Sequence, residues 1–204
     1  MEISPQIFRE YDIRGIASPG ADSPVTLSED VVERIGQAFA VYLRRKRTHN
    51  AVCVARDGRL TSKSLARALI DGIMAGGINV VDLGQAPTPV LYFALFNLKV
   101  DGGVMITGSH NPKEYNWMKV AVGKSTIHGE EIQKLGRIAM QGRFTVSRKP
   151  VTLTRIDIVP RYMRKIVSTV KPKRKLRVVV DAGNGVGGCI AAPLYEQLGC
   201  EVIP

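Results

Sequence analysis

Apolar positions recur along the chain with two different periods, and stretches of the two kinds alternate. The helical period predicts helices that begin after the capping residues Ser28 and Thr61, and three more over residues 87–98, 128–141 and 156–170. Short apolar runs predict strands over residues 51–55, 78–83, 103–106, 176–180 and 201–203, and residues 115–122 alternate as a strand does. Strands that alternate with helices in this way are typical of an α/β fold.

The length of the chain sets its domain organisation. Its 204 residues are enough for one large domain, or for one domain and part of another. Residues 142–154 have mixed charge and no clear period, so we expect a linker there. The chain ends at Pro204 just after a strand begins, and we therefore expect it to be the N-terminal portion of a longer protein.

Several features of composition indicate a cytoplasmic protein. No apolar run is long enough to cross a bilayer, and the charged residues Glu2, Arg9 and Glu10 exclude a signal peptide at the start. The three cysteines are widely spaced and lack the spacing of metal ligands, which favours a reducing compartment.

The formal net charge of +11 predicts an affinity for anions. Part of the charge lies in two basic clusters, at residues 44–47 and 171–177. Aromatic residues do not interleave either cluster, as they would on a surface that binds single-stranded nucleic acid. We interpret both clusters as solvated surface and expect neither nucleic acid nor membrane as a partner. Phosphorylated metabolites remain as the anions.

The stretch Thr107–Pro112 carries the most informative polar residues of the chain. It lies between two predicted strands, where it presents Ser109 to a cleft with His110 beside it and Lys119 ten positions on. Gly108 allows unusual backbone angles in the turn. The simplest alternative is a solvated hairpin whose polar side chains only satisfy backbone groups. A serine-hydrolase elbow is disfavoured, because Asn111 replaces the second glycine of its frame and His110 is poorly placed to hydrogen-bond the Ser109 hydroxyl.

Four segments, in order, resemble the signature segments of the α-D-phosphohexomutases, and most closely those of bacterial phosphomannomutase/phosphoglucomutase. They are Phe8–Gly15, Ala55–Arg59, Thr107–Lys119 and Val180–Gly185. Trp117 and Met118 depart from the pattern, because the family more often has Gly and Phe there. The resemblance implies a mixed sheet between helices in residues 1–145, which carry the serine loop, and the start of a second, similar α/β domain in residues 146–204.

The resemblance also implies a reaction, the interconversion of hexose 1-phosphate and hexose 6-phosphate (mannose or glucose) by an isomerase of the phosphotransferase type. Ser109 would carry the phosphoryl group and bind Mg²⁺ through it, together with aspartates beyond this chain. His110 and Lys119 would move protons, Arg14 would stabilise phosphoryl charge, and Tyr11, Arg14 and Lys119 would contact the phosphosugar. A hexose 1,6-bisphosphate would be intermediate and activator. The full-length enzyme would be a monomer, and the 204 residues alone would be inactive.

Two other classes of function stay open from the sequence. Residues 183–188 formally contain Gly-x-Gly-x-x-Gly between a strand and a helix, with Glu201 near the next strand, as in a dinucleotide-binding oxidoreductase. Against this, Glu201 opens its strand, whereas a ribose-binding acid normally closes one. A binding module is the third class, in which Arg14, Arg59 and the Ser109 loop only hold an anion.

Overall fold

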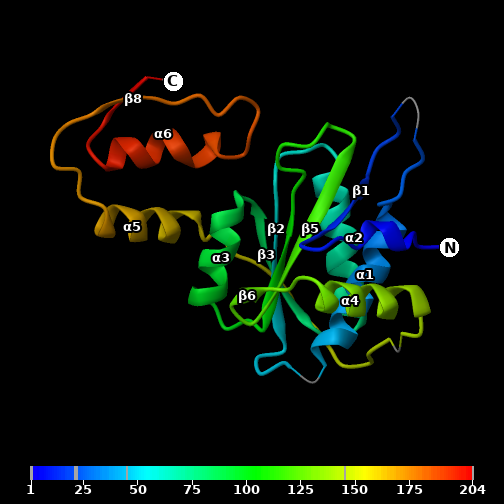
Figure 1. The fold of residues 1–204 in the computed structure, drawn as a ribbon. Helices are drawn as coiled ribbons and strands as arrows, with labels where there is room; N and C mark the ends of the chain where they lie inside the picture. The colour runs from blue at the N-terminus through cyan, green and yellow to red at the C-terminus, as the bar shows by residue number, and fades with distance from the viewer. Residues whose placement is uncertain (1, 21–22, 45, 145, 204) are drawn as a thin grey trace.

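The computed structural model describes residues 2–20, 23–44, 46–144 and 146–203, and a seven-stranded mixed sheet forms its centre (Figure 1). The strand order is β1-β5-β4-β2-β3-β7, and β6 pairs with β5. β2, β3, β4 and β7 run parallel to their neighbours in this group, and β5 is antiparallel to β1, β4 and β6. The strands are β1 (Ile13–Ile16), β2 (Ala51–Arg56), β3 (Asn79–Gln85), β4 (Gly102–Ile106), β5 (Tyr115–Val122), β6 (Ser125–Thr126) and β7 (Leu153–Arg155).

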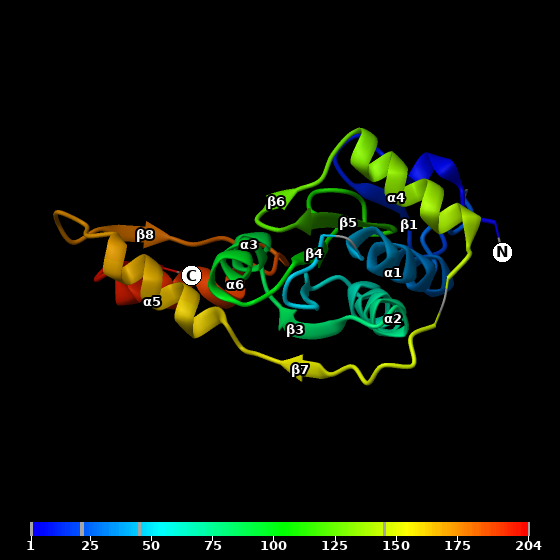
Figure 2. The same cartoon turned by 90° about the horizontal axis from the view of Figure 1, so that it is seen from below.

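Helices cover both faces of this sheet, so the predicted α/β class with a mixed sheet between helices is confirmed (Figure 2). The α-helices are α1 (Glu29–Leu43), α2 (Ser62–Ala75), α3 (Thr88–Asn97), α4 (Glu130–Gln141), α5 (Val159–Thr169) and α6 (Gly188–Gln197). A 3₁₀ helix, η1 (Pro5–Ile7), precedes β1. None of the helices in the described ranges is both long and apolar enough to cross a bilayer.

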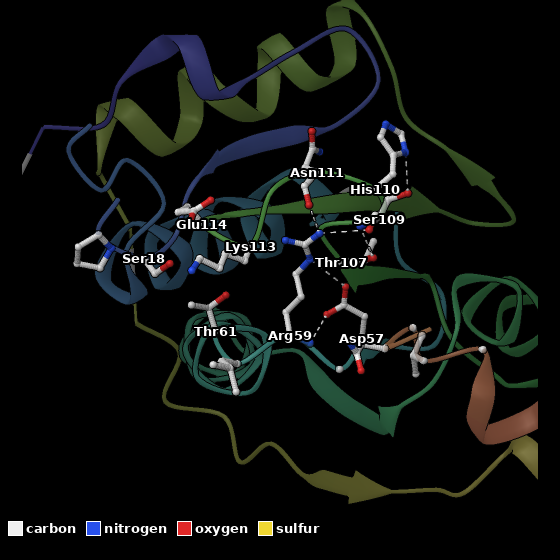
Figure 3. Close-up of a pocket in the computed structure, with 17 residues that line it drawn as sticks. Ser18, Asp57, Arg59, Thr61, Thr107, Ser109, His110, Asn111, Lys113 and Glu114 are labelled. Carbon is white, nitrogen blue, oxygen red and sulfur yellow. Dashed lines mark hydrogen bonds and ion pairs between the residues drawn. The ribbon is translucent and has the colours of Figure 1, made fainter. Parts of the chain in front are cut away.

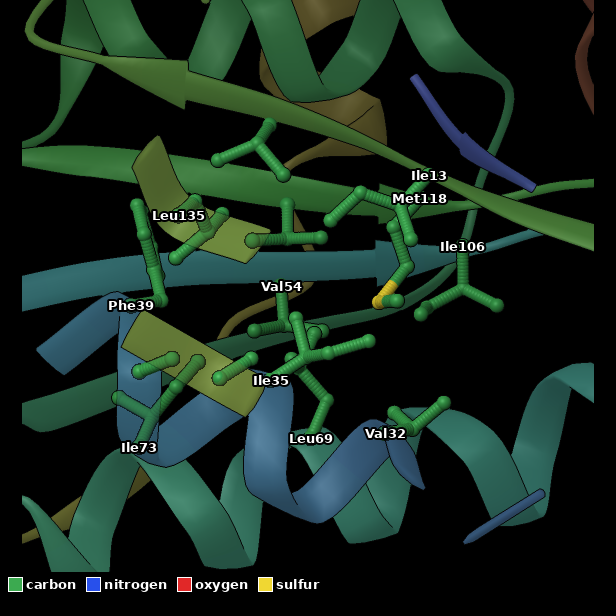
Figure 4. Packing of buried hydrophobic residues seen from close by; sticks show 14 of the residues in the cluster. Ile13, Val32, Ile35, Phe39, Val54, Leu69, Ile73, Ile106, Met118 and Leu135 are labelled. Carbon is green, nitrogen blue, oxygen red and sulfur yellow. The ribbon is translucent and has the colours of Figure 1, made fainter. Parts of the chain in front are cut away.

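The two-residue period of the strands divides the core into two apolar clusters. Val52 and Val54 of β2 face α1, α2 and α4, whereas Cys53 and Ala55 face α3. Figure 4 shows the larger cluster, which holds Val54 of β2 together with Ile35 and Phe39 of α1. Burying such aliphatic side chains contributes about 1.5–3 kcal/mol each, so the alternation in the sequence fixes which face of each strand points to which helices.

The two predicted helix caps have different outcomes. Ser28 caps α1 as predicted, because its Oγ accepts a hydrogen bond from the backbone N–H of Val31 at 3.3 Å. Thr61 occupies the N-cap position of α2 but makes no side-chain cap bond. Its Oγ1 accepts instead from the Asn116 side chain at 3.1 Å, so the predicted capping role of Thr61 is wrong.

β7 overlaps the end of the stretch, residues 142–154, that we expected to be a linker. It adds to the edge of the sheet by pairing with β3, so a strand beyond residue 145 belongs to the sheet of the first unit. α5 then packs against α3, where the rings of Phe93 and Tyr162 meet edge to face at 5.5 Å. The parallel pair β8 (Arg177–Val179) and β9 (Glu201–Ile203) forms a separate small sheet. The division of the chain at residue 145 into two domains stays a prediction.

The three cysteines are free and should differ widely in reactivity. Burial raises the pKa of the Cys53 thiol from 9.0 to about 12, which lowers its thiolate fraction roughly 1,000-fold. We expect the exposed Cys189 to react first with iodoacetamide, the half-buried Cys200 more slowly, and Cys53 only in denaturant. Peptide mass spectrometry over a time course measures this order. Early labelling of Cys53 in the folded chain would contradict the packing of β2 against α3.

Candidate active site

The loop between β4 and β5 presents the Ser109 side chain to solvent at the end of the sheet. Ser109 itself has a φ of +47°, a left-handed backbone conformation that is uncommon for a residue with a Cβ. The Ser109 N–H donates to Thr107 Oγ1 at 3.1 Å, and the Asn111 N–H donates to the Gly108 carbonyl at 3.0 Å. These bonds hold the turn in a form that costs on the order of 1 kcal/mol or more, as often occurs at functional sites.

The Arg59 guanidinium holds this loop from beneath (Figure 3). One terminal nitrogen, Nη1, donates to the carbonyls of Pro112 at 2.6 Å and Tyr115 at 2.9 Å. The other, Nη2, donates to the carbonyls of Ser109 at 3.2 Å and Asn111 at 2.6 Å. All four terminal N–H groups are therefore used on backbone carbonyls. Arg59 is a structural clamp, and its use of these four donors on the loop disfavours the alternative in which Arg59 only holds an anion.

Gly108 has a different role from the predicted one. Its backbone does not adopt a positive φ. A Cβ at this position would lie 2.0 Å from Nε of Arg59, so only glycine lets the guanidinium reach the carbonyls of the loop.

Asp57 anchors the clamp to the rest of the fold. Its Oδ1 accepts from the Arg59 N–H at 3.0 Å and from the Ser62 hydroxyl at 2.5 Å, and its Oδ2 accepts from the Gly108 N–H at 3.0 Å. Ser62 in turn accepts from the buried Asn116 side chain at 2.8 Å. The segment after β2 thus supports the serine loop through a buried polar network, in which each partner satisfies another.

His110 lies closer to the serine than we predicted. Its Nδ1 is 3.3 Å from the Ser109 Oγ, and both side chains are exposed. The prediction that His110 is poorly placed to contact this hydroxyl is therefore wrong. The reason is the left-handed φ of Ser109, which lets the neighbouring side chains point the same way. At this distance the imidazole can accept or return the proton of the hydroxyl.

Ser109 and His110 line a cleft of about 1040 Å³ (Figure 3). Arg59 and Asp57 also line it, as do Lys113 and Glu114 farther along the serine loop. The glycine-rich turn at residues 184–187 contributes to the lining from the far part of the chain. A cleft of this size can accommodate a phosphorylated sugar.

The other predicted site residues lie elsewhere. Arg14, Lys119 and Tyr11 do not line this cleft. Arg14 and Lys119 instead approach Trp117, with Cζ of Arg14 at 4.1 Å and Nζ of Lys119 at 5.6 Å from its ring centroid. The His110 ring meets the same indole edge to face at 6.0 Å. His110 therefore contacts both Ser109 in the cleft and Trp117 beside Arg14 and Lys119. Tyr11 is 69% exposed, and its ring lies 6.3 Å from that of His128.

The family profile for phosphoglucomutase/phosphomannomutase, alpha/beta/alpha domain I, matches residues 5–145. The chain belongs to the phosphoglucomutase/phosphomannomutase family. It is 41% identical over 200 residues to the phosphoglucomutase of Neisseria meningitidis serogroup A, a match that covers 98% of this chain and 42% of the relative. It is also 41% identical over 198 residues to the phosphomannomutase/phosphoglucomutase of Pseudomonas putida, with 97% and 41% covered.

Solved structures agree with this membership. A phosphoglucomutase/phosphomannomutase family protein from Burkholderia thailandensis superposes with a TM-score of 0.89 at 41% identity. The match covers 98% of this chain and 44% of that one. The chain therefore spans about two fifths of the length of the relatives that it matches.

In this member of the phosphoglucomutase/phosphomannomutase family, the surroundings of the glycine-rich turn at residues 183–188 differ from those of a dinucleotide site in one respect. β8, the turn, α6 and β9 do form a parallel unit. However, Glu201 opens β9 and pairs with Arg177 at the start of β8, with 3.2 Å between Oε1 and Nε. The acid thus lies at the end of the strands that is opposite to the turn. The oxidoreductase alternative has no support.

The family is known to use Mg²⁺, and the described residues can supply only part of such a site. Across the described ranges, no three side chains of the His, Cys, Asp and Glu types gather as a metal site would require. The Asp57 carboxylate is occupied by the hydrogen bonds that support the loop. The exposed Ser109 oxygen, once phosphorylated, fits as one hard oxygen ligand.

Sequence reasoning missed two residues of this site. It named Arg59 only as a possible anion ligand, and it noted Trp117 only as a departure from the family pattern. A signal for Arg59 was present, because Gly108 and Arg59 both lie in matching segments and a glycine before a nucleophile permits a close approach. Nothing in the sequence alone brings Arg14 to Trp117, since the register of β1 on β5 decides that contact.

Proposed function

We propose that the protein is a phosphohexomutase, which interconverts hexose 1-phosphate and hexose 6-phosphate through a phosphorylated Ser109. The main support for this proposal is the exposed Ser109, which lines a cleft and lies on a loop that Arg59 and Asp57 hold in place. The names of the relatives, phosphoglucomutase and phosphomannomutase, support glucose and mannose phosphates as substrates.

In the proposed cycle, the O–P bond to Ser109 Oγ breaks while a sugar hydroxyl forms a new O–P bond and loses its proton. The product of this half is a hexose 1,6-bisphosphate, and the second half returns its other phosphoryl group to Ser109. A serine ester suits this role because it is stable in water yet transfers its phosphoryl group when the charge is neutralised.

The chain's own residues supply the proton and charge chemistry of this cycle. His110, 3.3 Å from Ser109 Oγ, is placed to hold or return the proton of that hydroxyl. Lys119 is the candidate for the proton of the sugar hydroxyl. The guanidinium of Arg14 would stabilise phosphoryl charge, and Tyr11, which is largely exposed, would contact the sugar.

We propose that Mg²⁺ is bound by an oxygen of phosphorylated Ser109 and by aspartates from outside these 204 residues. When bound, it neutralises part of the phosphate charge. We also propose that a hexose 1,6-bisphosphate is the activator, that the protein is cytoplasmic, and that it functions as a monomer. The three free cysteines support the reducing compartment.

The decisive experiment assays the complete protein, as its gene encodes it. Glucose 1-phosphate or mannose 1-phosphate is supplied with Mg²⁺ and glucose 1,6-bisphosphate, and formation of the 6-phosphate is followed by a coupled dehydrogenase. Peptide mass spectrometry should find one phosphoryl group, on Ser109. Hexose phosphate turnover without any phosphorylation of Ser109 would rule out the proposed carrier. The same assay on the 204-residue chain tests the expectation that it is inactive alone.

Lys119→Met should lower kcat by about 100-fold or more while changing KM by only about threefold, because a proton-transfer group acts mainly in the transition state. Lys119 is half-buried on β5, where the methionine chain can occupy the same space. Lys124→Met is a matched control, since Lys124 is exposed just after β5 and also lies over an aromatic ring, that of Phe96, at 5.2 Å. A rise in KM alone would make Lys119 a binding residue.

A further inference from the structure

Trp117 is the only tryptophan of the chain, and its side chain is buried. Its side chain is 3% exposed, yet neither apolar cluster of the described residues includes it. The indole Nε1–H is buried and has no hydrogen-bond partner within the described ranges. A tryptophan placed only for hydrophobic packing would be expected to contact other apolar side chains.

The neighbours of the indole are instead the predicted catalytic residues. β1 and β5 are antiparallel, and their register places Arg14 directly opposite Trp117, so both side chains lie on one face of the sheet. Cζ of Arg14 stands 4.1 Å from the ring centroid, within the range of a cation–π contact. A hydrogen bond of 3.1 Å from Nη2 to Asp12 Oδ2 holds the other side of the guanidinium.

The same ring meets both proton-transfer candidates. The imidazole of His110 stands edge to face with it at 6.0 Å and an interplanar angle of 82°. Lys119 follows two positions after Trp117 on β5 and therefore lies on the same face, with Nζ 5.6 Å from the centroid. Met118 and Val120, on the opposite face, belong to the larger apolar cluster.

We propose that Trp117 is a positioning residue, whose π face fixes the Arg14 guanidinium and whose ring sets the spacing between Arg14 and His110 beside Ser109. Its effect on catalysis rests on the proposed phosphohexomutase function. The proposed positioning of Arg14 and His110 by Trp117 does not rest on that function, because it concerns only where the two side chains are held. The backbone adds to the coupling, since the Trp117 carbonyl accepts the Thr107 N–H at 3.0 Å at the start of the serine loop.

Two substitutions separate the π face from mere bulk. Trp117→Phe keeps an aromatic face for Arg14, whereas Trp117→Leu leaves an apolar side chain without one. Because Trp117→Leu removes the cation–π contact with Arg14, it should slow phosphoryl transfer to Ser109 by roughly tenfold. Trp117→Phe should stay within about twofold of the unaltered protein.

The test uses the complete protein labelled with ¹⁵N-arginine and treated with glucose 1,6-bisphosphate and Mg²⁺. The Nε–H resonance of Arg14, assigned with Arg14→Lys, should lie upfield of free arginine because it sits over the indole. The shift should persist in part in Trp117→Phe and vanish in Trp117→Leu, in step with the rate at which Ser109 gains a phosphoryl group. Arg14→Met tests the same contact from the other side, since it should move the indole Nε1–H resonance even if both Trp117 variants fail to fold.

An unchanged Arg14 resonance in Trp117→Leu, or an unchanged indole resonance in Arg14→Met, would overturn the proposal. An equal loss of the Ser109 phosphorylation rate in Trp117→Leu and Trp117→Phe would also overturn it, because the size of the side chain rather than its π face would then matter. If the unaltered protein never phosphorylates Ser109, the proposed function fails, and the two resonances still decide the positioning.

Discussion

Ser109→Ala is expected to reduce mutase turnover by roughly a thousandfold or more, because the carrier oxygen of the phosphoryl group is lost. The fold should persist, since the Ser109 side chain is exposed and its contact is with His110 at 3.3 Å. The positive φ of +47° at this position complicates a single variant, because alanine keeps the backbone strain. Ser109→Gly removes both the hydroxyl and the strain, so it should be equally inactive and no less stable.

The measurements are initial rates with glucose 1-phosphate, phosphoryl incorporation by mass spectrometry, and thermal unfolding. Ser125→Ala is the matched control, since Ser125 is an exposed serine on β6, beside β5. It should keep the turnover and phosphorylation of the unaltered protein. Turnover that survives in both Ser109 variants would show that another group carries the phosphoryl.

Arg59→Lys is expected to lower the free energy of unfolding by about 2–4 kcal/mol and to cut turnover by at least about tenfold. A lysine keeps the charge but cannot span four carbonyls, because its donors radiate from one nitrogen. The Arg59 side chain is only 17% exposed, so the abandoned carbonyls of the loop would lose partners that water cannot fully replace.

Arg67→Lys tests whether this effect belongs to the clamp. Arg67 lies on α2 near Arg59 in the chain and pairs with Asp71 at 2.9 Å, but its side chain is 72% exposed. An exposed pair of this kind contributes little, so its substitution should change stability by less than about 0.5 kcal/mol. Chemical denaturation measures both variants. Similar small effects for Arg59 and Arg67 would contradict the role of Arg59 as the support of the serine loop.

Local sequence was sufficient to predict most elements and the position of the serine loop. Helix periodicity and the Ser28 cap depend on neighbours three or four residues away, and the structure confirms them for α1. The strand β7 was missed because it is a short edge strand with exposed side chains, which leaves no apolar alternation to detect. Thr61 has the residue type of a helix cap, but its hydroxyl accepts a hydrogen bond from the buried Asn116 of a distant strand instead.

The site could be predicted by residue type but not by arrangement. Gly108 was expected to take the unusual backbone angles, whereas Ser109 takes them and Gly108 gives room to Arg59. Those details depend on contacts between β2, β4 and β5, which no local pattern encodes. In the same way, Arg14 and Lys119 meet at Trp117 because of strand register, and no pattern in the sequence predicts these contacts.

The four bonds from Arg59 to the loop also constrain how the proposed reaction can proceed. They join the segment from Ser109 to Tyr115 to the loop between β2 and α2, in which Arg59 lies. The backbone at Ser109 is then fixed, so the serine loop cannot move from one end of a sugar to the other. The proposed cycle transfers a phosphoryl group to one sugar oxygen and takes one back from another. Because the serine is fixed, the bisphosphorylated sugar must itself reorient within the site between the two transfers.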